Sequence, residues 1–441
     1  MDEPRITVGI CNGYGEIRGR LNGAYLTNGT RLTGEFIVRP RDGGVGLCDA
    51  FGREVLRARE IRLTAAGKST FTLRDVTIGV RFHWQRREEQ TFSGDLAFLP
   101  AGQGTLAAVN EIPLEEYLAS VVASEMNSEA PDAFLMAHAI ASRSWLMAML
   151  ERRGRVTDAT GCRERGSQRE GEVIRWYDRE DHLLFDVCAD DHCQRYQGIS
   201  GLLSGKAAQA VRETRGIFLI HEGKICDARY HKACGGLTED YATCWEEVSV
   251  PCLSHVSDSP RPYPPIRTEQ EAERWILSRP DVFCHTRDEA LLRRILPASD
   301  RETADFFRWR VSYGREELEA LLREKSGIDF GVLHQLVPLE RGPSGRIRLL
   351  RIEGSKAAVS VGKELEIRRW LSPSHLYSSA FIVSATLGAS GPPSRFTLFG
   401  AGWGHGVGLC QIGAAVMAAR GYAAEEILRH YFRGAALVKR Y

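Results

Sequence analysis

The sequence has no apolar segment that approaches the roughly 20 residues needed to cross a bilayer. Its first five residues also lack the basic region and the apolar core of a secretory signal, so we expect an intracellular protein or a mature or trimmed chain. Neither sign of charge is in excess, because 58 Lys and Arg stand against 57 Asp and Glu, a net charge of +1. We therefore expect no membrane span and no binding to nucleic acid.

Three common functional motifs are absent as well. No H-E-x-x-H motif occurs, and the glycine-dense stretch 400–413 fits neither G-x-G-x-x-G nor a phosphate loop, since Ala414 stands where that loop needs Lys. The glycines instead indicate a backbone that passes close to another part of the protein while holding Trp403, His405 and Gln411 in place. Such a set suits sugar recognition or catalysis, and a packed corner with a buried Trp and His is the alternative.

The 441 residues suffice for two or three domain-sized units, and 43% hydrophobic with 26% charged residues is typical of a soluble globular protein. Eleven cysteines are too few for a disulfide scaffold, and their odd number leaves at least one unpaired. Seven of them fall in the middle of the chain: Cys162, Cys188, Cys193, Cys226, Cys234, Cys244 and Cys252. This clustering indicates a local binding site or a local cross-link.

Residues 5–100 predict an all-β region. Strand-length apolar or alternating runs begin at Ile6, Gly34 and Ser69. The dipeptides Asn22-Gly23, Asn28-Gly29 and Asp42-Gly43 are expected to form the turns between strands.

Helical spacing replaces this pattern from Leu114 to Met126. A second helix is expected with Ser128 as N-cap, Pro131 near its first turn and Gly154 at its end. Its apolar face is predicted to comprise Phe134, His138, Ala141, Trp145 and Met149.

The rest of the chain mixes both kinds of element. We expect a helix around 315–322, a hairpin over 347–361 and a final helix from about 424 to 432. The predicted fold class is α+β: a β-rich N-terminal region (1–100), a core with a helical segment and a cysteine-containing β-rich part (101–255), an inserted α/β lobe (256–395) and a last core segment (396–441).

The stretch 182–193 is a candidate metal site. Cys188 and Cys193, with His182 upstream and His192 between them, could supply three tetrahedral Zn²⁺ ligands. A disulfide, or thiols buried as small hydrophobic groups, are the alternatives.

Cys234 precedes two glycines and is a candidate nucleophile, with His231 or His405 as its base. The alternative, which we favour, is a sharp glycine turn in which Cys244 and Cys252 form a disulfide or remain core thiols.

Glu125 follows apolar and small residues at the end of the first helix, where burial would raise the pKa of its carboxyl group. A protonated glutamate is what protonation of a glycosidic oxygen requires. By sequence position alone, most helix-end glutamates like Glu125, and most arginines placed like Arg143, are exposed to solvent.

The motifs, taken in order, resemble the SpoIID/LytB family of stage II sporulation protein D and the amidase-enhancer proteins. The matching segments are 109–118, 121–126, 137–145, Cys193-Gln194-Arg195-Tyr196-Gln197-Gly198, Cys234-Gly235-Gly236, Ser344-Gly345-Arg346, Gly402-Trp403-Gly404-His405-Gly406-Val407-Gly408 and His430-Tyr431-Phe432.

The resemblance implies a peptidoglycan lytic transglycosylase that prefers glycan strands stripped of peptides. It places the catalytic glutamate on Glu125 and an essential arginine on Arg143, and it implies a structural zinc ion on His182, Cys188 and Cys193. The residues expected to hold the sugars are Tyr196, Tyr230, His405 and Gln411.

The expected partner is the glycan strand, in the cell envelope or outside the cytoplasm, where members of the family act. Two other functions fit the motifs: a non-catalytic module that binds peptidoglycan and activates a cell-wall amidase, and a zinc hydrolase.

Overall fold

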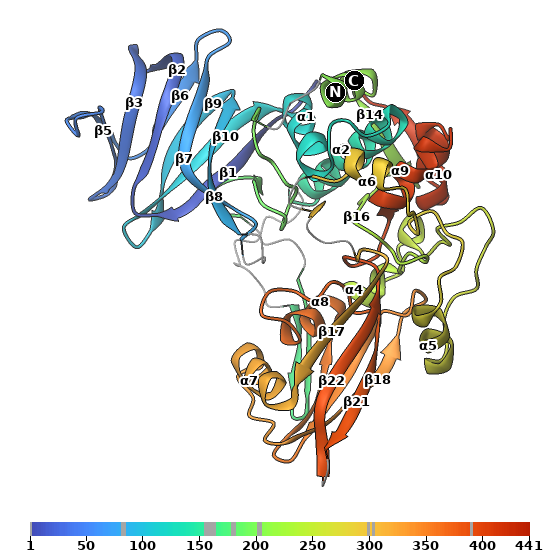
Figure 1. The fold of residues 1–441 in the computed structure, drawn as a ribbon. Coiled ribbons are helices and arrows are strands. Elements are labelled where there is room, and N and C mark those ends of the chain that lie inside the picture. Colours follow the sequence, from blue (N-terminus) through green and yellow to red (C-terminus); the bar gives the residue numbers. More distant parts are fainter. Residues whose placement is uncertain are drawn as a thin grey trace. The chain divides into compact units, whose positions relative to one another are not determined.

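The computed structural model describes residues 2–80, 85–153, 165–177, 182–200, 205–297, 300–301, 305–388 and 391–441 (Figure 1). The chain forms two compact units. Unit 1 comprises Met1–Glu129, Asp181–Ile217 and Lys439–Tyr441, and unit 2 comprises Ala130–Glu180 and Phe218–Val438.

Unit 1 is built on a largely antiparallel sheet, for which 11 strands are described. Its strands are β1 (Arg5–Tyr14), β2 (Ile17–Thr27), β3 (Thr30–Arg41), β4 (Gly44–Cys48), β5 (Glu54–Ala58), β6 (Ile61–Ala65), β7 (Thr70–Ile78), β8 (Arg86–Ser93), β9 (Asp95–Gly102), β10 (Thr105–Pro113) and β13 (Val187–Cys188). The main order is β13-β1-β10-β9-β6-β2-β3-β4-β5, with β7 paired to β2 and β8. The short strand β13 therefore returns to the sheet from far along the chain and runs parallel to β1. The predicted β-rich N-terminal region is confirmed.

One of the three predicted turns is wrong. Asn28-Gly29 and Asp42-Gly43 do connect β2 to β3 and β3 to β4, but Asn22-Gly23 lies inside β2. The pairing with β3 shifts register between Leu21 and Tyr25, so the dipeptide forms an irregularity within one strand. Gly23 has φ +116°, a backbone conformation that glycine adopts at bulges as readily as at turns.

Two helices belong to unit 1, α1 (Leu114–Glu125) and α3 (Lys206–Glu213). The predicted first helix is confirmed, and its apolar positions Leu114, Leu118, Val121 and Val122 are completely buried. The backbone becomes extended at Met126, so Glu125 is the last helical residue.

Unit 2 begins with the long helix α2 (Asp132–Arg153). The predicted N-cap at Ser128 is wrong, because the helix starts at Asp132, directly after Pro131. The predicted end at Gly154 lies outside the described residues. The five residues of the predicted face are buried, but so is nearly every other position between Phe134 and Met149, as expected for a helix surrounded by the core. By length and hydropathy alone Asp132–Arg152 could cross a membrane, yet 83% of its apolar window is buried inside the protein.

Two larger sheets carry the second half of unit 2. The five-stranded sheet contains β11 (Arg165–Arg169), β12 (Glu172–Trp176), β20 (Ala358–Gly362), β19 (Ile347–Gly354) and β18 (Leu333–Arg341), and the three-stranded sheet contains β17 (Arg308–Gly314), β22 (Gly391–Ala401) and β21 (Phe381–Gly388). The hairpin predicted over 347–361 is confirmed as β19 and β20.

The other helices of unit 2 are shorter than α2. They are α4 (Tyr241–Cys244), the 3₁₀ turn η1 (Pro251–Leu253), α5 (Glu269–Leu277), α6 (Glu289–Ile295), α7 (Arg315–Ser326), α8 (Glu364–Trp370), α9 (Gln411–Ala419) and α10 (Ala424–Tyr431). Two small sheets remain, β15 (Lys224–Ile225) with β14 (Ile217–His221) and β24 (Ala436–Lys439), and β16 (Tyr230–His231) with β23 (Leu409–Cys410). The helices predicted around 315–322 and 424–432 are confirmed as α7 and α10.

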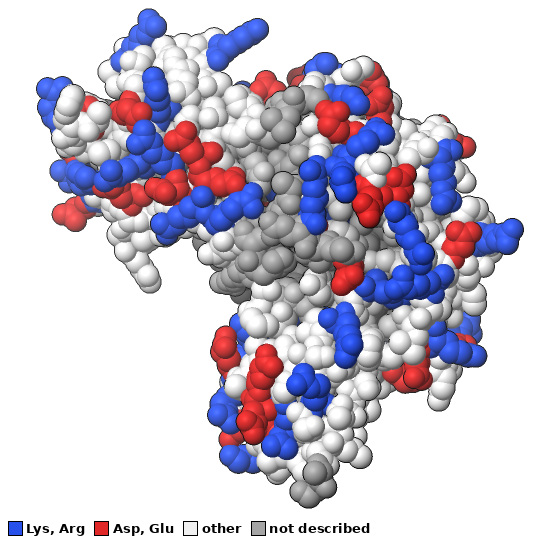
Figure 2. Space-filling view, viewed as in Figure 1, with Lys and Arg blue, Asp and Glu red and all other residues white. Residues whose placement is uncertain are grey.

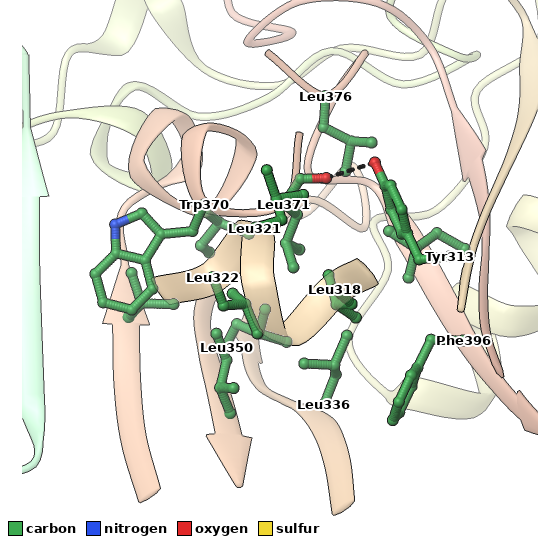
Figure 3. Close-up of a cluster of buried hydrophobic side chains, with 14 of the residues drawn as sticks. Tyr313, Leu318, Leu321, Leu322, Leu336, Leu350, Trp370, Leu371, Leu376 and Phe396 are labelled. Carbon is green, nitrogen blue, oxygen red and sulfur yellow. Dashed lines mark hydrogen bonds between the residues drawn. The ribbon is translucent and has the colours of Figure 1, made fainter. Parts of the chain in front are cut away.

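A hydrophobic core lies between α7, α8 and the two larger sheets of unit 2 (Figure 3). Leu318, Leu321 and Leu322 recur at helical spacing and are buried, which fixes the inward face of α7. The hydroxyl of Tyr313 donates a hydrogen bond of 2.7 Å to the carbonyl of Leu371, so the polar group within this core is satisfied.

These elements confirm the predicted α+β class. The proposed division at residues 100, 255 and 395 stays a prediction. Figure 2 shows Lys and Arg side chains interspersed with Asp and Glu on the face viewed, as the net charge of +1 leads one to expect.

Candidate functional site

Glu125 is held in place at the C-terminal end of α1. Its side chain is buried, with 8% of the residue exposed, and Oε1 accepts a hydrogen bond of 3.0 Å from the backbone N–H of Arg195. The apolar face of α1 carries Glu125 inward with it, so the alternative of a solvated helix-end glutamate does not apply. A buried carboxyl group with one oxygen fixed is suited to proton transfer at a defined atom.

The segment Cys193–Tyr196, which supplies this hydrogen bond, contacts α1 through neighbouring side chains. Tyr117 of α1 donates a hydrogen bond of 3.1 Å to Oε1 of Gln194, and its ring stacks on that of Tyr196 at 5.0 Å. The hydroxyl of Tyr196 donates to Oδ1 of Asn110 on β10 at 2.6 Å. Segment 193–196 thus joins the end of β10, the helix α1 and Glu125.

Tyr196 lies in unit 1 with Glu125, but it is 1% exposed and its hydroxyl bonds within the protein. Burial raises the pKa of both Tyr196 and Tyr117 above the usual value of 10. The predicted role of Tyr196 in sugar binding stays a prediction, and the described contacts show it supporting segment 193–196.

The candidate metal residues come together in unit 1. The ligand atoms of His182, Cys188, His192 and Cys193 all lie within 4.8 Å of one another. Nε2 of His182 is 3.4 Å from Sγ of Cys193, and Nδ1 of His192 is 3.5 Å from the same sulfur. Cys188 and Cys193 do not form a disulfide, so that alternative does not apply to this pair.

This cluster contains a candidate ligand beyond the three predicted ones, His192. Cys193 and the imidazoles of His182 and His192 lower the pKa of Cys188 to about 2, against the effect of burial. A thiolate is the form of cysteine that binds metals. In the sequence, the position of His192 between the two cysteines is the feature that could have identified it as a ligand.

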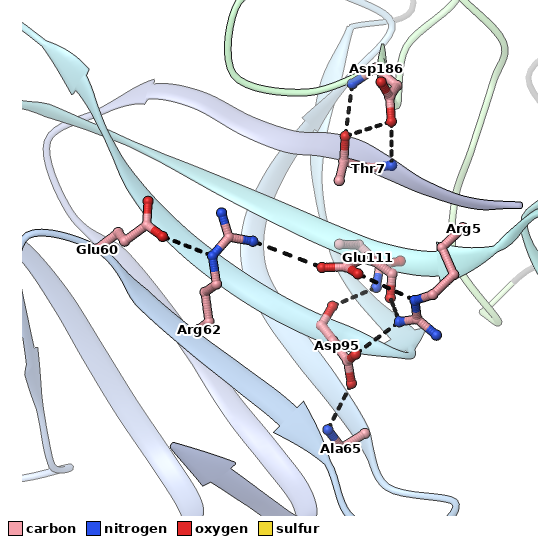
Figure 4. Close-up of polar contacts among 9 residues, drawn as sticks. Arg5, Thr7, Glu60, Arg62, Ala65, Asp95, Glu111 and Asp186 are labelled. Carbon is pink, nitrogen blue, oxygen red and sulfur yellow. Dashed lines mark hydrogen bonds and ion pairs between the residues drawn. The ribbon is translucent and has the colours of Figure 1, made fainter. Parts of the chain in front are cut away.

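The cluster is attached to the sheet through β13, and Figure 4 shows the contacts of Asp186, the residue before β13, with Thr7 of β1. Oδ2 of Asp186 accepts hydrogen bonds from the backbone N–H of Thr7 at 2.9 Å and from its hydroxyl at 2.8 Å, and the backbone N–H of Asp186 donates to Oγ1 of Thr7 at 2.9 Å. Val8 and Gly9 of β1 then pair with Val187 and Cys188. Cys188 is therefore positioned by β1, whose Thr7 lies 179 residues before Asp186 in the chain.

Two further contacts fix the flanks of the cluster. The backbone N–H groups of Gly79 and Val80 donate to the carboxylate of Asp190 at 3.0 and 2.8 Å. On the other side the ring of Phe185 lies 4.6 Å from that of His182, and a Cβ on Gly9 would stand 2.4 Å from the Phe185 ring. Glycine at position 9 lets this aromatic ring approach the sheet.

Arg143 belongs to unit 2 and lies in the middle of α2. The whole residue is 0% exposed, so the alternative of a surface cation does not apply. A buried guanidinium is costly unless it is hydrogen-bonded, which makes a specific role for Arg143 more plausible than its sequence position alone suggested.

Unit 2 also brings together Tyr230 and Gln411 with His138 of α2. The parallel pairing of β16 with β23 places Tyr230 beside Leu409, two residues before Gln411. The Gln411 amide nitrogen lies 3.1 Å from Nε2 of His138 and donates to it, and the Tyr230 ring lies 4.7 Å from the His138 ring. Burial lowers the pKa of His138 to about 3, so its imidazole is neutral and accepts this bond. Gln411 is 1% exposed.

The glycine-dense stretch wraps around Arg346. Its guanidinium donates to the carbonyl of Gly404 at 3.0 and 3.2 Å, to the carbonyl of Cys234 at 3.2 Å and to Oγ of Ser344 at 2.9 Å. A Cβ on Gly406 would stand 2.4 Å from the guanidinium carbon. The close backbone approach expected from the glycines is confirmed, with Arg346 as the group approached.

His405 is partly exposed on this loop, next to Trp245, whose ring lies 5.0 Å away. Burial, together with His231 and the guanidinium groups of Arg229 and Arg346, holds the pKa of His405 well below 6.5. A neutral imidazole beside an aromatic ring is compatible with the predicted sugar contact, which stays a prediction.

Cys234 does not form the nucleophile arrangement. It is 2% exposed, burial raises the pKa of its thiol well above 9, and Gly235 and Gly236 follow with φ of +80° and +110°. The sharp glycine turn is therefore the correct alternative. Cys244 and Cys252 are free, so the disulfide considered for them is absent.

Sequence comparisons agree with the motifs. Residues 102–221, which contain α1, Glu125 and the metal cluster, match the family described as Stage II sporulation protein (SpoIID). Residues 239–408 match a domain of unknown function, DUF8618. The first match covers the helix and the cluster, and the second covers much of unit 2.

Two curated proteins match over longer stretches. Stage II sporulation protein D of Bacillus amyloliquefaciens is 24% identical over 346 residues, which are 78% of this chain and 80% of that protein. An uncharacterized protein of Brachyspira hyodysenteriae is 23% identical over 356 residues, 79% of this chain and 72% of its own length. These matches confirm the resemblance to the SpoIID family that the ordered motifs indicate.

Proposed function

We propose that this chain acts on the bacterial cell wall in a sporulation-related role, as a peptidoglycan lytic transglycosylase with Glu125 as its general acid and base. The substrate is a glycan strand stripped of peptides, and the bond cleaved joins N-acetylmuramic acid to N-acetylglucosamine. The observation that carries the proposal is the burial of Glu125 and the fixing of its Oε1 by the N–H of Arg195, within the segment that matches the SpoIID family.

The reaction needs one carboxyl group. The acid form of Glu125 gives its proton to the glycosidic oxygen; the bond from C1 to that oxygen breaks, its electron pair stays on the oxygen, and positive charge develops at C1. The Glu125 carboxylate then takes the proton of the muramyl 6-hydroxyl, whose oxygen bonds to C1 and closes a 1,6-anhydro ring. No water is consumed, and Glu125 ends in the acid form in which it began.

Arg143 is the second catalytic residue in this proposal, and its cation favours the anionic form of groups near it. The sugars are bound by Tyr196, Tyr230, His405 and Gln411. The partly exposed His405 and Tyr230 are the more accessible of these four in the described structure.

The residues of the cluster in unit 1 fit a zinc ion. His182, Cys188 and Cys193 with His192 make a set of two nitrogen and two sulfur ligands, a composition typical of tetrahedral structural zinc. Bound zinc would supply a fixed cross-link rather than an activated water, since four protein ligands leave no open position. Cys193 and Arg195 belong to one short segment, so such a cross-link holds the donor that fixes Glu125.

We further propose that the protein acts outside the cytoplasm, where glycan strands are accessible. The proposed partner is a cell-wall amidase. It would remove the peptides from the glycan strand, and this chain would then cleave the stripped strand.

The test is mass spectrometry of the products released from denuded and from intact peptidoglycan. Wild type is expected to release 1,6-anhydro sugars from denuded strands, and Glu125→Gln to release about 10²–10⁴-fold less. Glu116→Gln, an exposed glutamate on the same helix, is the matched control and should retain wild-type release.

Equal rates for Glu125→Gln and wild type would refute the enzyme. If wild type binds denuded glycan, releases nothing and raises the turnover of an added amidase, the activator function is correct instead. Circular dichroism of each variant confirms that the fold is intact in every comparison.

A further inference from the structure

A second group of metal-binding side chains lies in unit 2 and has no part in the proposed reaction. Cys234, Asp258, Cys284 and Cys410 place their ligand atoms within 4.8 Å of one another. Each is buried, at most 3% exposed. They come from four separate segments: the turn after β16, the stretch between η1 and α5, the loop between α5 and α6, and the end of β23.

The spacing fits a single ion better than it fits a disulfide. Sγ of Cys234 lies 3.6 Å from Sγ of Cys284, and none of the three cysteines forms a disulfide. Ligands about 2.3 Å from one zinc ion stand roughly 3.8 Å apart in a tetrahedron. A disulfide needs about 2.05 Å between its sulfurs.

The surroundings of the four groups donate hydrogen bonds to them. Cys410 accepts from the backbone N–H of Cys234 at 3.3 Å and of Gly413 at 3.4 Å, and Cys234 accepts from that of Gly236 at 3.3 Å. Such donors stabilise thiolates and orient them, as groups around metal ligands do.

Asp258 gives an independent indication of a cation. It is 0% exposed and accepts from the hydroxyl of Tyr431 at 2.5 Å and from the backbone N–H of Cys284 at 2.8 Å. Among the residues that the structure describes, no basic side chain forms an ion pair with it. These two hydrogen bonds leave the charge of the buried carboxylate unneutralised, which is costly, whereas a bound cation removes that cost.

We propose that Cys234, Asp258, Cys284 and Cys410 hold a second, structural metal ion of the thiolate-preferring class, Zn²⁺ in the first place. Two of these ligands, Asp258 and Cys284, lie within the DUF8618 match, and Cys234 and Cys410 flank it closely on either side. The ion therefore cross-links this segment to β16 and β23, the strands that carry Tyr230 and precede Gln411.

Zinc per chain is the quantity that tests the proposal. In full-length protein purified under reducing conditions without chelators, elemental analysis should give two zinc ions for wild type and for Cys48→Ser, which changes a buried cysteine outside both clusters. The double variant Cys188→Ser/Cys193→Ser should keep one, and Cys284→Ser should also keep one. A wild-type protein with a single ion that the double variant loses completely overturns the second site.

A second measurement covers the case in which Cys284→Ser does not fold. Cobalt(II) is added to metal-free Cys188→Ser/Cys193→Ser protein, in which only the second cluster retains its thiols. The proposal requires sulfur-to-cobalt charge-transfer bands and the visible bands of tetrahedral cobalt. Absence of those bands, or intact-mass data showing Cys234 and Cys284 joined as a disulfide after alkylation, contradicts it.

Discussion

The backbone N–H of Arg195 donates a hydrogen bond of 3.0 Å to the carboxyl oxygen of Glu125, 70 residues earlier in the chain. The same short segment contributes Cys193 to the metal cluster and stacks Tyr196 on Tyr117. The position of the candidate catalytic group therefore depends on a loop whose order depends on the cluster and on its contacts with the sheet.

Loss of the zinc ion proposed for the cluster in unit 1 should unfold the site before it abolishes any chemistry. Cys193→Ser, which removes one ligand of this ion, is expected to cost a few kcal/mol, and each kcal/mol lowers Tm by about 2–4 °C in a unit of this size. Glycan cleavage should fall in parallel with Tm, whereas a zinc hydrolase would lose activity on chelation with Tm unchanged. Tm from calorimetry and product release, measured on the same samples, distinguish a structural zinc ion from a zinc hydrolase. Cys48→Ser is the control variant.

Thr7→Val should loosen the attachment of β13 while keeping the shape of the side chain. The substitution removes the hydroxyl that donates to Asp186 and accepts from its backbone N–H, at a cost of about 1–3 kcal/mol. Zinc affinity of the Cys188 cluster should fall roughly 10–100-fold, as when support around ligands is lost. Thr30→Val changes an exposed threonine of the same sheet and should alter neither quantity in urea unfolding or zinc titration.

Gly406→Ala should be far more damaging than Gly421→Ala. Both glycines have positive φ, +84° and +91°, so both substitutions carry a backbone cost of about 1–2 kcal/mol. At Gly421 nothing lies within 4 Å of the added Cβ, but at Gly406 it would overlap the guanidinium of Arg346 and displace its hydrogen bonds. We expect Gly406→Ala to cost about 3–5 kcal/mol in total. Equal losses of unfolding free energy in the two variants would disprove this role of Arg346.

His138 should make the protein sensitive to acid. Burial lowers its folded-state pKa from 6.5 to about 3, so below pH 6.5 the unfolded chain binds a proton that the folded chain does not. Stability is therefore unaffected above pH 6.5 and falls as the pH drops from 6.5 toward 3, by on the order of 5 kcal/mol in all. His138→Gln should flatten this part of a Tm-versus-pH curve relative to wild type. His334→Gln, which replaces an exposed histidine, should leave the curve's slope as it was.

Local elements were predictable because their signals lie within a few residues. The helical spacing of Leu114 to Val122 defined α1, and the hairpin predicted over 347–361 is formed by β19 and β20. The turn expected at Asn22-Gly23 was wrong because β2 pairs with β3 both before the dipeptide, up to Leu21, and after it, from Tyr25. The N-cap expected at Ser128 was wrong because α2 begins only after Pro131.

The sequence by itself determined the class of fold, the ordered motifs that resemble the SpoIID family, and Glu125, His182, Cys188 and Cys193 as candidates. Only the tertiary structure decided that Glu125 and Arg143 are buried, that His192 joins the first cluster, and that Cys284 and Asp258 meet Cys234 and Cys410. The physical reason is that spacing along a chain reports which residues share a helix face or a strand. Burial and ligand geometry, in contrast, arise from contacts such as Thr7 with Asp186, which form only when distant strands pair.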